Sequence, residues 1–440
     1  MLCGPVTVVT LTLHLLVVTF GYPLINMSIV YFQAGVVPIV ILFALFSLVS
    51  LFINMLFADG IALLEGNENY ELNLEYSGLA KELFSKHVYY IFLFVYIAYN
   101  IAANIAMGRI VAQAADDFIV LVSGHDYGLQ FYPKLEFVKV ESSSYFYNNP
   151  GQLVLAITVG YLIMTAILAP MALFQLFAAL GIQALLLVLV GLACVEFVYF
   201  FAKQGLVQHV PLFGSTWTQV MGPIIFNLGV GGSIPLWLNQ KKPHVHTKTV
   251  MTSVSCIILV LNISLPVLGA YVYGSKITSD IFELMTTISP TVLCRVAVYI
   301  YTLTVIGSSI PINSLTVKNN LYTEVWANVP FTWLIGIFLQ YIVGWVALSG
   351  GIFTTFLNYV SLFIGGWCGF FFPIIMYIIL QRDYVRRTGA PASPLGLLPK
   401  WLLPHWKIVA GACLAITAIP TLAQIVLDFY FLIFLHKNVV

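Results

Sequence analysis

The sequence predicts an all-α, polytopic membrane protein of about eleven transmembrane helices, two of which are interrupted. Three observations support this prediction: the composition, the length of the apolar stretches, and two breaks rich in Gly and Pro. Of the 440 residues, 60% are hydrophobic, 15% aromatic and 8% charged, and the mean hydropathy is +0.98. A soluble domain carries about 25% charged residues. Most of the surface is therefore expected to face lipid.

Apolar stretches long enough to cross a bilayer fill most of the chain. A spanning helix requires about 20 mostly apolar residues. We find eleven such stretches, at about 5–33, 37–64, 87–122, 151–169, 175–202, 216–239, 247–273, 289–317, 331–349, 351–380 and 406–435. The first lacks the basic start of a signal peptide and is too long for one, so we predict a helix there. In this interpretation residues 1–440 form a single transmembrane domain.

Lysine and arginine are distributed unevenly over the connecting loops. If the N-terminus is cytoplasmic, the cytoplasmic loops carry eleven basic residues and the opposite loops carry five. Basic loops tend to stay in the cytoplasm, so we predict that the N-terminus is cytoplasmic. The longest loop, 123–150, then faces the exterior or an organelle lumen. No targeting motif distinguishes the plasma membrane from a lysosome- or vacuole-like membrane.

Two spans contain helix-breaking residues: "TFGYP" (Thr19–Pro23) in the first and "LGVGGSIP" (Leu228–Pro235) in the sixth. Irregular backbone persists inside lipid only where protein or a water-filled cavity covers it. Interrupted spans at corresponding positions of two halves indicate a transporter built from inverted repeats. Here they head helices 1–5 (about 5–202) and helices 6–10 (about 216–380), and helix 11 (about 406–435) is additional. The alternative is that the glycines only permit close helix packing.

The ends of an interrupted helix carry unpaired backbone groups. Free N–H groups have partial positive charge, and free C=O groups have partial negative charge. Two interrupted helices that cross near the middle of the membrane offer both kinds of group to one small ligand. An amino acid, with its carboxylate and ammonium on one carbon, suits such a site. Because no acidic residue lies at either break, a neutral amino acid is expected.

Several motifs occur in one order along the chain. The sixth span carries "IFNLGVGGSIPLWLNQKKPHV", which is similar to a signature of the form FNF…PSWxNEKxP. The remaining motifs are "YFQAGVVP" (31–38), "LLEGNENYELNLEYS" (63–77), "VAQAADDFI" with "GLQFYP" (111–133) and "SSIPINSLTVKNNL" (308–321). Together they resemble the amino acid/auxin permease family of transmembrane amino acid transporters, which belongs to the APC superfamily. The resemblance covers about residues 19–380.

This resemblance implies a LeuT-like fold of eleven helices that moves amino acids by alternating access. In such proteins the site lies among helices one, three, six and eight. The implied substrate-binding residues lie on helices one and six: Gly21, Tyr22, Asn26, Phe226, Asn227, Gly229, Gly231 and Gly232. Ser308 and Ser309 of helix eight stand where relatives place hydroxyl groups near a coupling cation.

Departures from the family pattern bear on the coupling ion. Sodium-coupled relatives have an asparagine just before the glycine of the first helix, and Val17 occupies that position here. Loss of this oxygen favours coupling to H+, or no coupling, over Na+. Two ionisable residues within spans are further candidates. Arg109 is expected either to line the permeation path or to form a structural ion pair, and His14 either to carry a proton or to pack as a hydrogen-bonded residue.

The sequence contains none of the common catalytic or metal-binding motifs, and its six cysteines form no CxxC pair. We therefore expect no catalytic residue, no cofactor and no metal site. A net charge of +1 is not that of a nucleic-acid-binding protein. The expected partners are an amino acid substrate and the lipid bilayer. Without a P-loop, transport is expected to be driven by a gradient. A non-transporting amino acid sensor that uses the same pocket is the alternative.

Overall fold

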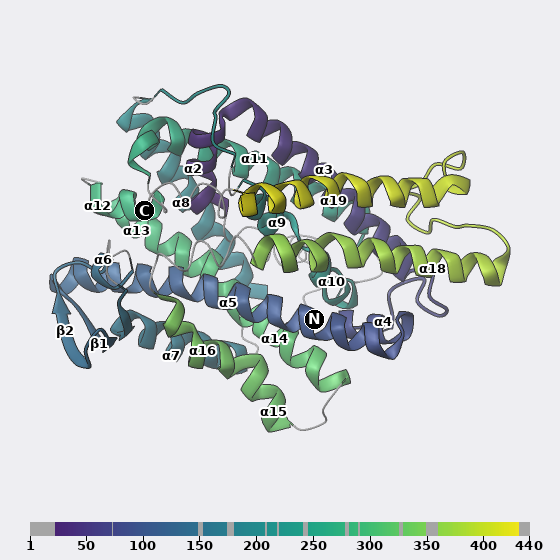
Figure 1. The fold of residues 1–440 in the computed structure, drawn as a ribbon, viewed down its shortest axis with the longest axis horizontal. Coiled ribbons are helices and arrows are strands. Elements are labelled where there is room, and N and C mark those ends of the chain that lie inside the picture. The colour runs from purple at the N-terminus through teal and green to yellow at the C-terminus, as the bar shows by residue number, and fades with distance from the viewer. Residues whose placement is uncertain are drawn as a thin grey trace.

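A computed structural model describes most of the chain as a bundle of helices (Figure 1). It describes residues 23–72, 74–147, 153–173, 180–206, 209–217, 220–240, 245–277, 281–288, 291–324, 329–348 and 360–430. Within these ranges, eight helices are long and apolar enough to cross a membrane, and α7 (Val159–Leu173) is a shorter apolar helix. The prediction of a helical, multi-pass membrane protein is confirmed.

The helices of the first half follow the predicted stretches. They are α2 (Pro23–Ala34), α3 (Val36–Ile61), α5 (Lys86–Ser123), α7 and α8 (Leu180–Gln204), with the short α4 (Tyr76–Leu83) between α3 and α5. α2 begins at Pro23, the last residue of the first predicted break. The residues before Pro23 lie outside the described part of the chain, and with them His14, Gly21 and Tyr22.

The helices of the second half are more irregular. The sixth span consists of α9 (Met221–Leu228), a 3-10 turn η2 (Gly231–Ser233) and α10 (Ile234–Gln240), and is followed by α11 (Thr247–Tyr273), η3 (Gly274–Lys276) and α12 (Ile281–Ile288). The eighth consists of α13 (Val292–Tyr301), η4 (Thr302–Ile306) and α14 (Gly307–Glu324), and the ninth of α15 (Val329–Trp333), η5 (Leu334–Phe338), α16 (Leu339–Val343) and η6 (Gly344–Leu348). The last two contain η7 (Ser361–Gly365), η8 (Trp367–Phe371) and α18 (Phe372–Thr388), then η9 (Leu403–His405) and α19 (Trp406–Tyr430).

Four of these segments, η4, η5, η7 and η8, are turns of π-helix. A π-helical turn inserts an extra residue into an α-helix, changes which side chains face a neighbour, and is frequent at functional sites. Two of the four, η7 and η8, lie in the tenth span and pack against α9 and η2 of the interrupted sixth span. They therefore help to decide which residues reach the centre of the molecule.

The long loop after α5 folds into a small antiparallel sheet that the sequence did not predict. Its strands are β1 (Asp126–Tyr132), β2 (Glu136–Val140) and β3 (Leu155–Thr158), in the order β2-β1-β3, and the short α6 (Ser144–Tyr147) lies between β2 and β3. The stretch predicted as a helix from residue 151 thus begins with a strand, and α7 starts only at Val159. Burial alternates along β1, with Asp126, Gly128 and Gln130 on the buried face and the apolar Leu129 and Phe131 on the exposed face.

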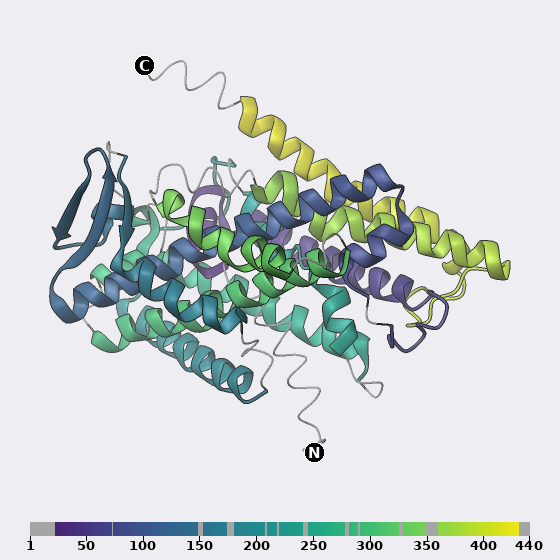
Figure 2. The same cartoon turned by 90° about the horizontal axis from the view of Figure 1, so that it is seen from below.

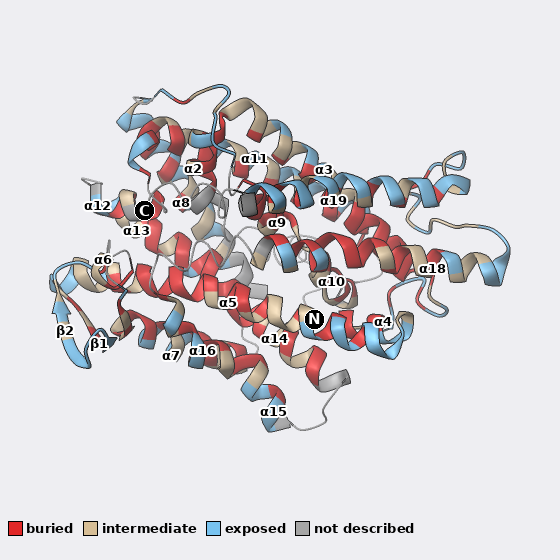
Figure 3. Ribbon diagram, viewed as in Figure 1, coloured by how far each residue is buried: buried red, intermediate tan, exposed pale blue. Residues whose placement is uncertain are grey.

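The two ends of the bundle differ in structure (Figures 1 and 2). The sheet covers one end, and the connection between α18 and α19 lies at the opposite end with the loop that precedes α4. Figure 3 shows that buried residues follow the inner faces of α5, α14 and α9, whereas exposed residues follow the outer faces of the bundle. Many exposed residues are large and apolar, such as Phe94, Leu192 and Val426. An apolar outer surface around a packed interior is what a lipid environment requires.

The turn between α2 and α3 holds the loop that leads into the sixth span. Gly35 has a φ of +94°, a conformation that a side chain disfavours. The amides of Val36 and Val37 donate to the carbonyls of Pro211 and Leu212, each at 3.1 Å. The amide of Gly214 donates to the Ala34 carbonyl at 2.9 Å. The end of the first span and the start of the sixth, far apart in the sequence, are therefore joined by backbone hydrogen bonds.

Candidate functional site

The sixth span is interrupted where the glycines predicted it. α9 ends at Leu228, and the next two residues leave the helical conformation, with Gly229 at φ −79°, ψ 52° and Val230 at φ −87°, ψ 1°. The Gly229 amide still donates to the Ile225 carbonyl at 2.8 Å, but the Val230 amide turns to the Leu228 carbonyl at 2.9 Å. The interruption is short, and it ends the regular pairing of the α9 carbonyls.

Three glycines at this break allow different neighbours to come close. A Cβ on Gly229 would lie 2.9 Å from the Ile225 carbonyl oxygen. A Cβ on Gly231 would lie 2.5 Å from Cγ of Pro373 and 2.6 Å from the Gly369 carbonyl oxygen. A Cβ on Gly232 would lie 2.9 Å from the Tyr96 ring. Close packing against the tenth span is thus a definite role of Gly231.

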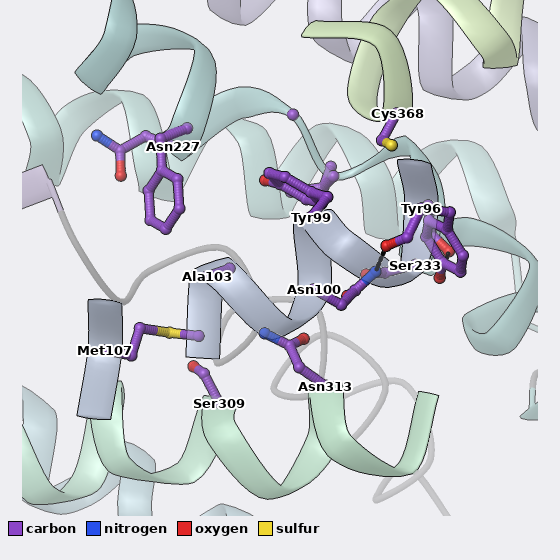
Figure 4. A pocket seen from close by; sticks show the side chains of 14 residues that line it. Tyr96, Tyr99, Asn100, Ala103, Met107, Asn227, Ser233, Ser309, Asn313 and Cys368 are labelled. Carbon is purple, nitrogen blue, oxygen red and sulfur yellow. Dashed lines mark hydrogen bonds between the residues drawn. The ribbon is translucent and has the colours of Figure 1, made fainter. Parts of the chain in front are cut away.

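A cavity of about 70 Å³ lies against this break (Figure 4). By the same measure one water molecule needs about 10–15 Å³, so the cavity has room for several waters. We name it the central cavity. Its described lining comes from α5, the sixth span, α14 and η8, and consists of Tyr96, Tyr99, Asn100, Ala103, Met107, Phe226, Asn227, Gly229, Val230, Gly232, Ser233, Ser309, Asn313 and Cys368. None of these side chains is charged at neutral pH.

Five of the predicted residues line the central cavity: Phe226, Asn227, Gly229, Gly232 and Ser309. They come from two spans that lie more than 70 residues apart in the sequence, and the fold brings them to one place. Figure 4 shows Ser309 and Asn313 side by side on α14, with Met107 of α5 beside Ser309 and Asn227 on the opposite side of the view from Asn313.

Other predicted residues lie elsewhere. Ser308 is fully buried and donates to the Val305 carbonyl at 3.2 Å, and it is not among the lining residues. Gly231 is also absent from the described lining, because it faces Gly369 and Pro373. Asn26 lies in α2, of which the structure describes the backbone at this position.

Arg109 is buried on α5 and binds backbone carbonyls. Its Nε donates to the Leu348 carbonyl at 3.1 Å, and one terminal nitrogen donates to the Tyr147 carbonyl at 3.3 Å. Its guanidinium also lies 5.8 Å from the centre of the Tyr147 ring. These contacts join α5 to the end of the ninth span and to α6, so Arg109 lies between the central cavity and the sheet end of the bundle.

The family resemblance implied that the third span contributes to the site, but sequence reasoning did not name the α5 residues that line the cavity: Tyr96, Tyr99, Asn100, Ala103 and Met107. Their spacing of three and four residues places them on one face of the helix. Asn100 donates to the Tyr96 carbonyl at 2.8 Å, which fixes its side chain beside the cavity (Figure 4). An amide within an apolar span was a visible signal, because polar side chains inside a membrane require partners.

The central cavity is closed on the α4 side by aromatic side chains. The Tyr96 hydroxyl donates to the Gly232 carbonyl at 3.2 Å, and the Tyr76 hydroxyl donates to the Cys368 carbonyl at 3.1 Å. The Tyr76 ring lies edge-on to Tyr96 and Phe92, with centroids 5.0 and 4.9 Å apart. These contacts join α4 and α5 to the sixth and tenth spans beside the cavity.

Two of the motifs that suggested the family meet at this closed end. The Ser77 amide donates to Oδ1 of Asn320 at 2.9 Å, and Nδ2 of Asn320 donates to Glu75 at 3.4 Å. Asn239 at the end of α10 exchanges two hydrogen bonds with the backbone of Leu74, at 2.9 and 3.2 Å. The segment before α4 therefore joins the sixth span to the eighth.

Comparison with known proteins identifies the fold class of the chain. No protein-family model and no curated protein matches the chain. Among solved structures, the chain is similar to MHP1, a nucleobase-cation-symport-1 family transporter in a closed conformation with bromovinylhydantoin bound. The similarity covers 100% of this chain and 97% of that chain, with 12% sequence identity and a TM-score of 0.59. The chain therefore has the LeuT-like fold, as its interrupted spans suggested.

Proposed function

We propose that this protein is a secondary transporter that carries small neutral amino acids across a membrane by alternating access. The observation that carries the proposal is the central cavity, which lies against the interrupted sixth span of a LeuT-like fold. Its described lining offers backbone, amide and hydroxyl groups and no charged side chain. A zwitterion with a neutral side chain matches such a lining, since a charged side chain would be left without a counter-charge.

Asn227 supports binding of a polar ligand at the break. It is buried, and neither its nitrogen nor its oxygen has a hydrogen-bond partner. A buried polar group without a partner costs about 1–3 kcal/mol. A ligand carboxylate that accepted a hydrogen bond from this amide would remove that cost. The carbonyl end of α9, which carries partial negative charge, would favour the ammonium group of the same ligand.

A second candidate substrate is a planar heterocycle with imide or amide groups. The central cavity combines the rings of Tyr99 and Phe226 with the amides of Asn100 and Asn313. Aromatic rings stack on planar ligands, and carboxamides pair with imides. The similar solved structure holds bromovinylhydantoin, which has this chemistry. We favour the amino acid because the sequence motifs resemble amino acid permeases.

The proposed energy source is a proton gradient, or the substrate gradient alone. The sequence basis is Val17, which lacks the oxygen found at this position in sodium-coupled relatives. The proposed site is the plasma membrane or a lysosome- or vacuole-like membrane, with a cytoplasmic N-terminus. In that orientation the basic end of α18, with Arg386 and Arg387, and the aromatic closure beside α4 face the cytoplasm.

Uptake by proteoliposomes tests the proposal. The full chain is reconstituted, and uptake of labelled amino acids is measured at two pH values, with and without a sodium gradient, beside protein-free vesicles. We expect accumulation of one or more neutral amino acids, and exchange of unlabelled for labelled substrate in counterflow. Absence of flux for every amino acid would contradict the proposal. Flux of uracil or a hydantoin without amino acid flux would favour the second candidate.

The same preparation separates a transporter from a sensor. A sensor would bind an amino acid in the central cavity and show no flux. Thermal stabilisation by an amino acid, combined with no uptake and no counterflow, would therefore support the sensor. Stabilisation together with counterflow supports the transporter, because exchange requires the cavity to open on both sides of the membrane.

A further inference from the structure

A second cavity lies behind the break, on the side of α3 and α11. Its volume is about 40 Å³, which is room for an ion with a water molecule. The described lining comes from α3, the sixth span and α11, and its polar members are Ser47, Ser50, Asn54, Asn227 and Ser255. Asn227 also lines the central cavity, so one side chain borders both spaces.

Three polar residues of α3 line this second cavity: Ser47, Ser50 and Asn54. α3 is the most apolar of the candidate spans, with a mean hydropathy of 2.9 over its best window. Ser47, Ser50 and Asn54 are nevertheless buried and occur at spacings of three and four residues, on one face of the helix. Polar side chains inside a membrane are costly unless they bind a partner. The presence of three polar side chains on this face of α3 therefore requires an explanation other than packing.

Two of the asparagines are incompletely bonded. Asn54 donates from Nδ2 to the Ser50 hydroxyl at 3.3 Å, but its Oδ1 is buried without a partner. The Ser50 hydroxyl in turn donates to the Leu228 carbonyl at 2.6 Å. Asn227, with a relative exposure of 3%, has no partner for either amide atom. Two amide oxygens thus lie at one small cavity with their lone pairs unused.

The polar groups at the second cavity include two unpartnered amide oxygens, of Asn54 and Asn227, which can only accept hydrogen bonds. Besides the two amide oxygens there are the hydroxyls of Ser47 and Ser255, and the last turn of α9 ends here with its partial negative charge. Neutral hard oxygens bind hard cations. The described lining contains no carboxylate to balance a divalent ion, and no histidine or acid that could titrate. The two amide oxygens favour a cation over an anion, and the absence of a carboxylate or a titratable group from the described lining favours a monovalent cation over a divalent ion or a proton.

We propose that the second cavity binds a monovalent hard cation, Na+, through the neutral oxygens of Ser47, Asn54 and Asn227. Bound there, the cation would hold the Asn227 oxygen and leave its Nδ2 to donate into the central cavity. Na+ is thus an activating ligand that raises substrate affinity, and transport can still be driven by another gradient. The linkage to substrate rests on the proposed function, whereas binding of the cation itself does not.

Thermal unfolding with the sodium ion alone tests this inference. The full chain in detergent is melted in NaCl, KCl and choline chloride at equal ionic strength, without substrate, and followed by tryptophan fluorescence. A ligand that binds only the folded state raises the Tm in a saturable way. We expect a saturable rise in NaCl that exceeds the rise in the other two salts. Equal Tm values in the three salts would overturn the proposal and leave ordered water as the content of the cavity.

Variants assign the shift to the second cavity. Asn54→Leu removes one proposed ligand and is expected to abolish the sodium-specific shift, and Ser47→Ala is expected to weaken it. Asn262→Leu is the matched control, because Asn262 is an equally buried amide on α11 with an unpartnered nitrogen and does not line this cavity. A sodium shift that survives in both Asn54→Leu and Ser47→Ala would contradict the assignment. If Asn54→Leu does not fold, Ser47→Ala decides.

This test is independent of amino acid uptake. A sodium-specific shift without any amino acid flux would support the cation site and contradict the proposed transport. Amino acid flux without a sodium-specific shift would support the proposed transport and contradict the cation site. Where both occur, the apparent substrate affinity is expected to fall when Na+ is replaced by choline, and this dependence is expected to be lost in Asn54→Leu.

Discussion

Two walls of the central cavity, α5 and the sixth span, are built in opposite ways. α5 is a continuous helix of 38 residues and contributes side chains, among them Tyr96 and Asn100. The sixth span is interrupted after Leu228 and contributes glycines, backbone groups and Asn227. A continuous helix satisfies its own backbone, so it can recognise a ligand only through side chains. An interrupted helix offers its backbone, but it requires close neighbours to cover the break.

The difference predicts that the two walls tolerate different substitutions. At the break, an added methyl group is expected to harm packing before it harms binding. On α5, replacing a polar side chain that lines the cavity by an apolar one of similar size is expected to change ligand binding and leave the fold intact. The first two of the following four predictions test this distinction, and the other two extend it to α14 and to the start of α4, in order of decreasing effect.

The largest effect is expected for Gly231→Ala. Its Cβ would lie 2.6 Å from the Gly369 carbonyl oxygen and 2.5 Å from the Pro373 ring, and neither the backbone nor a proline ring can turn away. Overpacking of this kind costs about 1–3 kcal/mol. We expect a clear fall in the Tm of the purified protein.

The matched variant is Gly232→Ala. Its Cβ would lie 2.9 Å from the Tyr96 ring and 3.6 Å from the Tyr76 ring, and since both neighbours are side chains and not backbone, the fall in Tm is expected to be smaller. Because Tyr96 donates to the Gly232 carbonyl, uptake is still expected to fall. If Gly231→Ala melts at the wild-type temperature, the glycines at the break are not required for packing and the comparison fails.

Next in size is a pair of leucine substitutions on α5. Asn104 donates to Oε1 of Gln340 at 2.6 Å and to the Ser314 hydroxyl at 3.3 Å, away from the central cavity. Asn104→Leu leaves buried acceptors unpaired and is expected to cost about 1–3 kcal/mol of stability. Asn100→Leu loses one bond to its own helix, at about 1 kcal/mol, but removes an amide from the cavity wall.

Opposite signatures are therefore expected from the two variants. Asn104→Leu should lower the Tm and leave the apparent substrate affinity nearly unchanged. Asn100→Leu should keep the Tm within a few degrees and weaken substrate binding. Thermal unfolding and concentration-dependent uptake measure the two effects. A wild-type substrate affinity in Asn100→Leu would remove α5 from the site.

A smaller difference is expected between two adjacent serines of α14. Ser308 and Ser309 are both buried, and both donate to the Val305 carbonyl, at 3.2 and 2.9 Å. Alanine at either position should therefore cost a similar free energy of unfolding, about 1 kcal/mol. Only Ser309 lines the central cavity.

We accordingly expect Ser309→Ala to lower the substrate affinity by up to about tenfold, the equivalent of roughly 1.4 kcal/mol, and Ser308→Ala to leave it unchanged. Uptake as a function of substrate concentration gives both affinities. Equal losses in the two variants would indicate that this part of α14 acts only through packing.

The smallest effect concerns Glu75, at the start of α4 near Tyr96. Burial raises the pKa of its carboxyl group above the ordinary value. Because the folded pKa is the higher one, ionisation of Glu75 destabilises the fold, and stability falls as the pH rises through that pKa. Glu75→Gln keeps the shape and removes the charge. We expect the variant to melt slightly above the wild type at pH 7 and at the same temperature near pH 4. A lower Tm at pH 7 would show that the charge is stabilising.

The position of the spans and of the sixth-span break could be predicted from the sequence, because each depends on neighbouring residues. Twenty apolar residues specify a membrane helix wherever they occur. The glycines and proline around Val230 interrupt a helix through their own backbone preferences. Asn227 and Ser309, which line the central cavity, were expected at the site because the motifs around them resemble those of the amino acid/auxin permease family. The first break lies outside the described residues and stays a prediction.

Only the tertiary structure separates Gly231 from Gly232, or Ser308 from Ser309. Neighbouring residues on a helix point about 100° apart, so the angle at which two helices cross decides which of them faces a cavity and which faces a partner. The same holds for Arg109, which is paired with carbonyls of the ninth span and α6. The sheet between α5 and α7 likewise forms through pairing of β1 with β3, whose partners are distant in sequence. Sequence alone thus determined most of the helical spans and the break in the sixth span, and packing decided which atoms meet there.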